Sequence, residues 1–149
     1  MIRSLAAVLL ASCCGLVASE AQERSAHVNY VLRCAGCHGL EGAGSSVGGI
    51  PDFRGYVGAF TRTEPARTYV MHVPGVIGAS LSDAEIAAVM NYIVEEWGED
   101  STPQPFEPFT AEEVARRRAE PVGDVVAYRR QVVEELAGMG VPTAEYPWP

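Results

Sequence analysis

The sequence predicts an all-α fold, with a helical domain followed by a helical C-terminal extension. Hydrophobic residues recur at intervals of three and four along residues 86–97, a spacing that places them on one face of a helix. Ser82 and Glu85, just ahead of this segment, have the spacing of a capping box, and the same pattern recurs near residue 110. Prolines gather between residues 102 and 109 and separate the two helical regions.

The overall composition allows a globular protein and excludes one class of partner. The chain has 149 residues, of which 48% are hydrophobic, enough to bury a core. The formal net charge is −8, and every one of the 11 basic residues is an arginine. Because an acidic surface repels phosphate, we expect no nucleic-acid partner.

The N-terminal segment reads as an export signal. Arg3 precedes an apolar run over residues 5–17, and small residues at Ser19 and Ala21 suit cleavage after Ala21. We therefore predict that residues 1–21 are a signal peptide and that the mature protein is periplasmic. The alternative is a lipoprotein box ending at Cys13, in which case a lipid would tether the protein to a membrane.

The rest of the chain divides into three predicted parts. Residues 22–98 form the first domain, residues 99–109 form a proline-rich linker, and residues 110–149 form the C-terminal helical extension. Within the extension we expect helices over residues 110–120 and 124–137. An extension of this size is too small for a core of its own, so its apolar face is expected to pack on the first domain rather than on another protein.

One short motif carries the chemistry. Cys34, Cys37 and His38 follow the pattern Cys-x-x-Cys-His, which is the attachment signature of haem c. In such a site the two thiols add to the porphyrin vinyl groups, and the histidine binds the iron as its proximal ligand. The sequence therefore predicts one covalently bound haem c per chain.

Two other uses of a cysteine pair fit the surroundings less well. A thioredoxin-like redox motif needs a strand before it and a helix after it, whereas residues 25–32 have a helical pattern and glycines follow the motif. A zinc site needs further ligands at metal spacing. The only other histidines are His27 and His72, so the sequence favours haem over both alternatives.

Residues 25–98 resemble the class I cytochrome c family. The resemblance rests on the helical segment leading into "CAGCHG", on "EGAG" and on "LSDAEIAAVMNYI". It implies that the first and last helices of the domain cross beside the haem edge, and that a loop between them brings a methionine to the iron. Among family members, the chain looks most like small bacterial periplasmic electron carriers.

The resemblance implies a function of one-electron transfer. The protein would pass electrons between a periplasmic dehydrogenase and a terminal oxidase or reductase, or act as a subunit of such a complex. No serine–histidine–acid set or phosphate-binding loop is evident, so we do not expect an enzyme. The alternative is a haem enzyme or gas-binding sensor whose sixth iron position is open.

The sixth iron ligand is the least determined part of the site. Met71 is the only methionine between His38 and the helix that starts near Ser82, which makes it the expected distal ligand. His72 is the main rival, because imidazole also binds haem iron readily. Met71 could instead be a core residue on the inward face of a strand, alternating with Tyr69 and Val73.

Other residues are candidates for contacts with the haem. Arg54, Arg62 and Arg67 carry guanidinium groups that suit a haem propionate. Pro51 and Phe53 lie where the resemblance implies a loop that folds over the haem.

Overall fold

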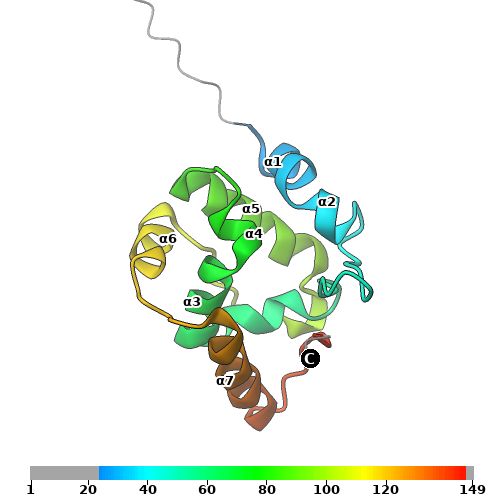
Figure 1. Cartoon of the computed structure of the whole chain (residues 1–149), viewed down its shortest axis with the longest axis vertical. Helices are drawn as coiled ribbons and strands as arrows, with labels where there is room; N and C mark the ends of the chain where they lie inside the picture. Colours follow the sequence, from blue (N-terminus) through cyan, green and yellow to red (C-terminus); the bar gives the residue numbers. More distant parts are fainter. Residues whose placement is uncertain (1–23, 147–149) are drawn as a thin grey trace, which may run out of the picture.

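The structure is a computed structural model, and it describes residues 24–146 (Figure 1). The predicted signal peptide, including Cys13, lies outside this range. Within residues 24–146 the chain forms seven α-helices, two short 3-10 helices and no strand, which confirms the predicted all-α fold. The elements are α1 (Ala26–Arg33), α2 (Ala35–His38), η1 (Val57–Thr61), α3 (Glu64–His72), α4 (Pro74–Ile77), α5 (Asp83–Trp97), η2 (Glu99–Ser101), α6 (Ala111–Arg118) and α7 (Val125–Gly138).

The first helix packs on α5 and positions the cysteine motif. Ser25 caps α1, because its Oγ accepts a hydrogen bond from the backbone N–H of Val28 at 3.3 Å. Tyr30 is 1% exposed, and its ring centroid lies 4.8 Å from that of Trp97 on α5. Its hydroxyl donates to the carbonyl of Gly39, just after the motif, at 2.5 Å. One buried side chain therefore joins α1, α5 and the segment that carries the cysteines.

Helix α5 begins as the sequence predicts. The Ser82 Oγ accepts from the Glu85 backbone N–H at 3.2 Å, and the Ser82 N–H donates to the Glu85 carboxylate at 2.9 Å. The predicted capping box is thus confirmed. The residues that α5 buries are Ile86, Ala87, Val89, Met90, Ile93, Val94 and Trp97.

We expect Ser82→Ala to lower the free energy of unfolding of the haem-loaded protein by about 1 kcal/mol, because the first turn of α5 loses its side-chain acceptor. Urea denaturation followed by circular dichroism measures the change. Ser46→Ala, at an exposed serine in the loop after the motif, is the control and should change the value by less than about 0.5 kcal/mol. Equal losses in the two variants would contradict a specific capping role.

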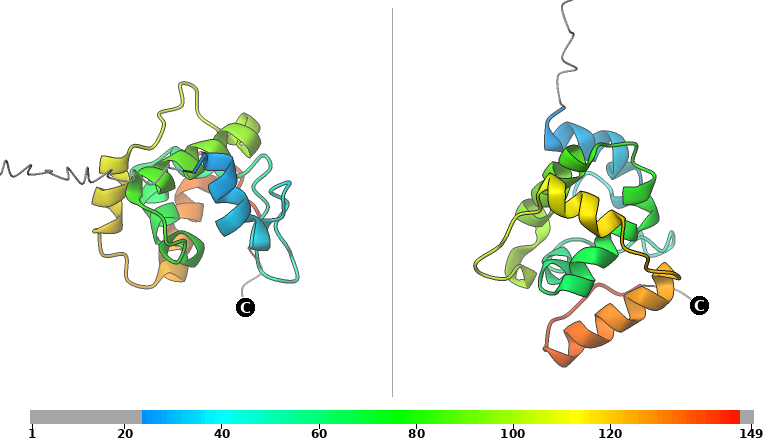
Figure 2. Two further views of the ribbon diagram at one scale, coloured as in Figure 1. Left: turned by 90° about the horizontal axis from the view of Figure 1, so that it is seen from above. Right: turned by 90° about the vertical axis from the view of Figure 1, so that its left-hand side faces the viewer.

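The C-terminal extension packs on the first domain, as predicted. Helix α6 contacts both α3 and α5, and α7 contacts α3 (Figures 1 and 2). Ahead of α6, the Asn91 side-chain amide exchanges two hydrogen bonds with the backbone of Phe109, at 3.0 and 2.7 Å. Phe109, at the end of the linker, and Val114, Val132 and Leu136 of the extension belong to the shared hydrophobic core.

A buried ionic network also fastens α6 to α3. Arg67 of α3 and Arg117 of α6 both bind the Glu113 carboxylate, each with its Nε at 2.7 Å from Oε1. Arg117 is only 1% exposed, and it also donates to Thr68 Oγ1 and to Glu64 Oε2, both at 2.9 Å. Charges this deeply buried need such complete pairing, so the network fixes how the extension sits on the domain.

Candidate haem site

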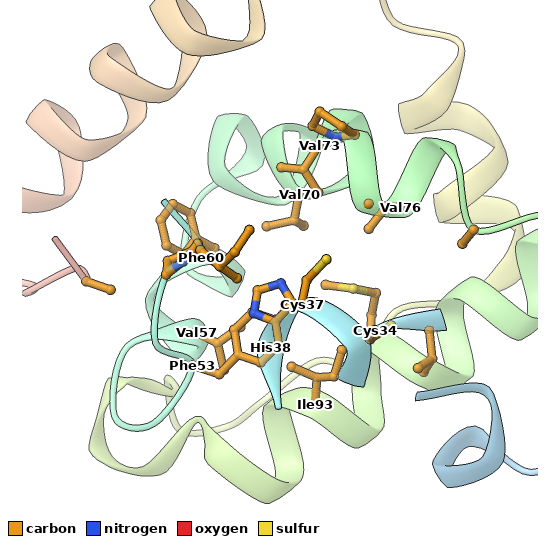
Figure 3. Close-up of a pocket in the computed structure, with 18 of the residues that line it drawn as sticks. Cys34, Cys37, His38, Phe53, Val57, Phe60, Val70, Val73, Val76 and Ile93 are labelled. Atoms are coloured by element: carbon orange, nitrogen blue, oxygen red, sulfur yellow. The ribbon is translucent and has the colours of Figure 1, made fainter. Parts of the chain in front are cut away.

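A cavity of about 440 Å³ lies between the cysteine motif and helices α3, α4 and α5 (Figure 3). Its wall is mainly apolar, which suits a flat hydrophobic ligand. The apolar residues that line it include Val57, Phe60, Val70, Val73, Val76, Leu81, Ile86, Val89, Met90 and Ile93.

The cysteine motif forms one side of this cavity. Cys34 ends α1, and the single helical turn of α2 then places Cys37 and His38 against the same space (Figure 3). The two cysteines do not form a disulfide with each other; Cys34 is half-buried and Cys37 is exposed. Burial, together with the nearby Cys37, raises the pKa of the Cys34 thiol. Two thiols and an imidazole thus border one apolar cavity.

His38 is held in a neutral form that suits metal binding. Burial lowers the pKa of His38 to about 4, and the Pro51 carbonyl opposes this shift only in part. The ring stacks on Phe53, with centroids 3.8 Å apart and planes 15° from parallel. Within residues 24–146, the buried Nδ1 has no hydrogen-bond partner that satisfies the geometry. A neutral imidazole in an apolar cavity keeps a lone pair available for iron.

A tight loop carries Pro51 and Phe53 to the cavity. Gly44 has a φ of +65°, and a Cβ at this position would collide with the backbone carbonyl oxygens of Ile50 and Pro51. The loop closes through a backbone pair between Ser45 and Ile50, with both N–O distances 2.9 Å. Glycine is required here because only it allows both the left-handed backbone and this close approach.

The residues present therefore fit a covalent haem. Cys34 and Cys37 could supply the two thioether links, His38 could supply an iron ligand, and the apolar wall could enclose the porphyrin. In the described residues the three side chains of the motif come from the end of α1 and from α2, whereas the apolar wall comes from η1, α3, α4 and α5 and the residues that join them.

The segment around Met71 is helical rather than extended. Helix α3 covers Tyr69, Met71 and His72, so the strand-face alternative is wrong. Tyr69 lines the cavity, whereas Met71 is fully buried away from it. The His72 Nε2 lies 2.8 Å from the carbonyl oxygen of Arg117, on the side of α3 that meets α6. The structure thus brings the cysteine motif to the cavity and leaves both candidate distal ligands outside its lining.

The three arginines named as propionate candidates have other partners. Within residues 24–146, none of them lines the cavity. Their nearest partners are the Asp52 carboxylate for Arg54 at 2.8 Å, the Ser101 carbonyl for Arg62 at 2.8 Å and the Glu113 carboxylate for Arg67 at 2.7 Å.

Two arginines that sequence reasoning missed do line the cavity. Arg33 is the last residue of α1, one position before Cys34. Arg129 comes from α7, donates to the Ala144 carbonyl at 3.2 Å and lies 4.3 Å from the Tyr146 ring centroid. Because Arg33 is next to the cysteine motif in the sequence, its place at the cavity could have been predicted. Arg129 reaches the cavity only because the extension packs on the first domain.

The length and apolar character of the described helices bear on whether any of them could cross a membrane. In residues 24–146, no helix combines the length and the apolar character that crossing a bilayer requires.

Two known proteins that carry the same name are similar to this chain in sequence. No protein-family model matches the chain. A cytochrome c-552 from Thermus thermophilus is 35% identical over 137 residues, which cover 80% of this chain and 88% of the relative. A second cytochrome c-552 from the same species is 37% identical over 105 residues, covering 58% of this chain and 79% of the relative.

These relatives agree with the fold and with the chemistry of the cavity. Identity of this level over most of the relative's length shows common descent, so the predicted family and the predicted haem c are confirmed. The chain belongs to the class I c-type cytochromes and is an electron-transfer protein that carries one covalent haem c.

Proposed function

We propose that Cys34 and Cys37 form the thioether links to the haem and that His38 is the proximal iron ligand. The observation that carries this proposal is the convergence of all three side chains on one apolar cavity (Figure 3). When bound, the haem supplies a couple of Fe(III) and Fe(II) that exchanges one electron. The protein's residues hold the porphyrin, orient the imidazole and exclude water.

We further propose that the chain works in the periplasm as a carrier between a dehydrogenase and a terminal oxidase or reductase, or as a subunit of such a complex. In this proposal residues 1–21 are removed on export, residues 22–98 form the haem domain, residues 99–109 form the linker and residues 110–149 form the extension. N-terminal sequencing of the exported protein tests the cleavage site. A lipid-modified Cys13 at the new N-terminus would instead mean a membrane tether.

The surface near the motif supports transient docking of a partner. Leu32 and Leu40, on either side of the motif, are 58% and 66% exposed. With a net charge of −8, any charged partner face should be basic.

A redox titration of the protein, produced together with a haem-attachment system, tests the carrier function. We expect a haem stain that survives a denaturing gel and a reversible one-electron transition between Fe(III) and Fe(II). The titration should follow the same curve in the oxidative and reductive directions. A chain that leaves the attachment system without haem, or whose iron does not cycle reversibly, would contradict the proposal.

A further inference from the structure

Helices α3 and α4 form a wall across the cavity from the cysteine motif. Val70 and Val73 lie at the C-terminal end of α3, and Val76 follows in α4. In Figure 3 these three side chains lie on the opposite side of the open space from Cys37 and His38. We call Val70, Val73 and Val76 the valine wall. A haem held by His38 would have this wall on its other face.

Met71 does not belong to the valine wall. Each residue of an α-helix is rotated by about 100° from the one before. The Met71 side chain therefore points away from the side of α3 that Tyr69, Val70 and Val73 share. The Met71 side chain is fully buried within the hydrophobic core. Bringing its sulfur into the cavity would require α3 to turn about its axis. The contacts on the other side of α3 resist such a turn.

His72 is one of those contacts. Its Nε2 lies 2.8 Å from the Arg117 carbonyl oxygen. Arg117 itself donates to the Glu64 carbonyl and to Thr68 Oγ1, at 3.0 and 2.9 Å. Glu64, Thr68 and His72 are spaced by four residues and so form one stripe of α3. This stripe is docked on α6, which keeps His72 on the side away from the cavity.

Met90 lines the cavity from a different wall. It lies on α5, about one turn before Ile93. Ile93 lies on the same side of the open space as His38, across from the valine wall (Figure 3). Met90 therefore lines the cavity from α5 rather than from the valine wall, and replacing it tests whether its sulfur binds the iron.

We propose that the haem iron has no protein ligand opposite His38, and that its sixth position binds a small neutral diatomic molecule such as carbon monoxide or nitric oxide beneath the valine wall. The inference rests on the proposed function, since it requires a haem bound through His38. The three valine side chains carry no hydrogen-bond donor and no charge, and a neutral diatomic molecule is a ligand that needs neither. The protein would then both transfer electrons and bind a gas.

Carbon monoxide binding to the reduced, haem-loaded protein tests the proposal. We expect a saturable shift of the absorption spectrum with one carbon monoxide per haem. We also expect the oxidised protein to lack the charge-transfer band of a methionine–iron bond. A reduced protein that leaves carbon monoxide unbound, or an oxidised protein that shows this band, would overturn the inference.

Four variants locate the bound gas. Met71→Leu and His72→Gln should leave the spectrum and the rate of carbon monoxide binding unchanged, and Met90→Leu, which alters the cavity wall, should not make that binding faster. Val73→Phe, which fills space at the valine wall, should reduce that rate severalfold. Faster binding in any of the first three variants would identify the replaced residue as a displaced ligand and overturn the proposal. An unchanged rate in Val73→Phe would overturn the placement beneath the wall.

The same samples separate this inference from the proposed function. A haem-stained protein with a reversible redox transition that fails to bind carbon monoxide keeps the proposed function and rejects the open sixth position. A protein without covalent haem rejects both.

Discussion

Glu113→Ala should lower the free energy of unfolding by about 3–5 kcal/mol, because it leaves two buried guanidinium groups without their shared carboxylate. Arg67 is 8% exposed and Arg117 is 1% exposed, so water cannot replace the lost partner. Guanidinium chloride denaturation of the haem-loaded protein measures the loss. Glu134→Ala removes the same charge from an exposed position on α7 and should change the value by less than about 0.5 kcal/mol.

The free energy of unfolding that Glu113 contributes should also depend on pH. Burial tends to raise the pKa of Glu113, but the hydrogen bonds and charges of Arg67 and Arg117 prevail and hold it below its ordinary value of 4.5. A carboxyl whose pKa is lower in the folded state stabilises fully above its unfolded pKa and loses this effect as the pH falls through its folded pKa. The difference between Glu113→Ala and the unchanged protein should therefore be largest near neutral pH and shrink below about 4.5. A difference that is constant down to pH 3 would contradict the ionic interpretation.

Replacing Cys34 and Cys37 together with serine should abolish covalent haem attachment. Serine hydroxyls do not form the thioether links, so the haem stain on a denaturing gel should disappear. The matched control replaces Cys13 and Cys14 with serine, which removes the same number of thiols and should leave the stain intact. Loss of the stain in the control alone would contradict the assignment of the attachment site.

The parts of the fold that the sequence predicted well depend on neighbours a few positions apart. Ser82 and Glu85 form a capping box because their hydrogen bonds span three residues. The cysteine motif likewise acts within a single helical turn. Such contacts form wherever the chain becomes helical, so spacing alone is sufficient to predict them.

Helix α3 shows why the distal face was harder to predict. The alternation of Tyr69, Met71 and Val73 is compatible with a strand, but three residues are too few to separate a period of two from a period of 3.6. The start of α3 carries clearer signals. Thr63 accepts a hydrogen bond from the Ala66 N–H at 3.3 Å, and proline occupies the first turn. The direction of Met71 depends on how α3 docks on α6, which no local pattern encodes.

Arg129 illustrates a different limit of sequence reasoning. The apolar stripe of its helix predicted that the extension packs on the domain, and α7 does contact α3. Which polar residue of the extension would reach the cavity depends on the angle of that packing. Arg54, Arg62 and Arg67 were nearer the motif in sequence, yet each is bound elsewhere.

The cavity lining comes from both ends of the described chain, since Arg33 and Tyr146 border the same space. The cavity is therefore complete only after the C-terminal segment has folded back, a late event because closing a long loop costs entropy. Cys34 and Cys37 emerge early from the ribosome, so their thiols are accessible before the pocket closes around them. Maturation has a natural order in this chain, with attachment first and enclosure second.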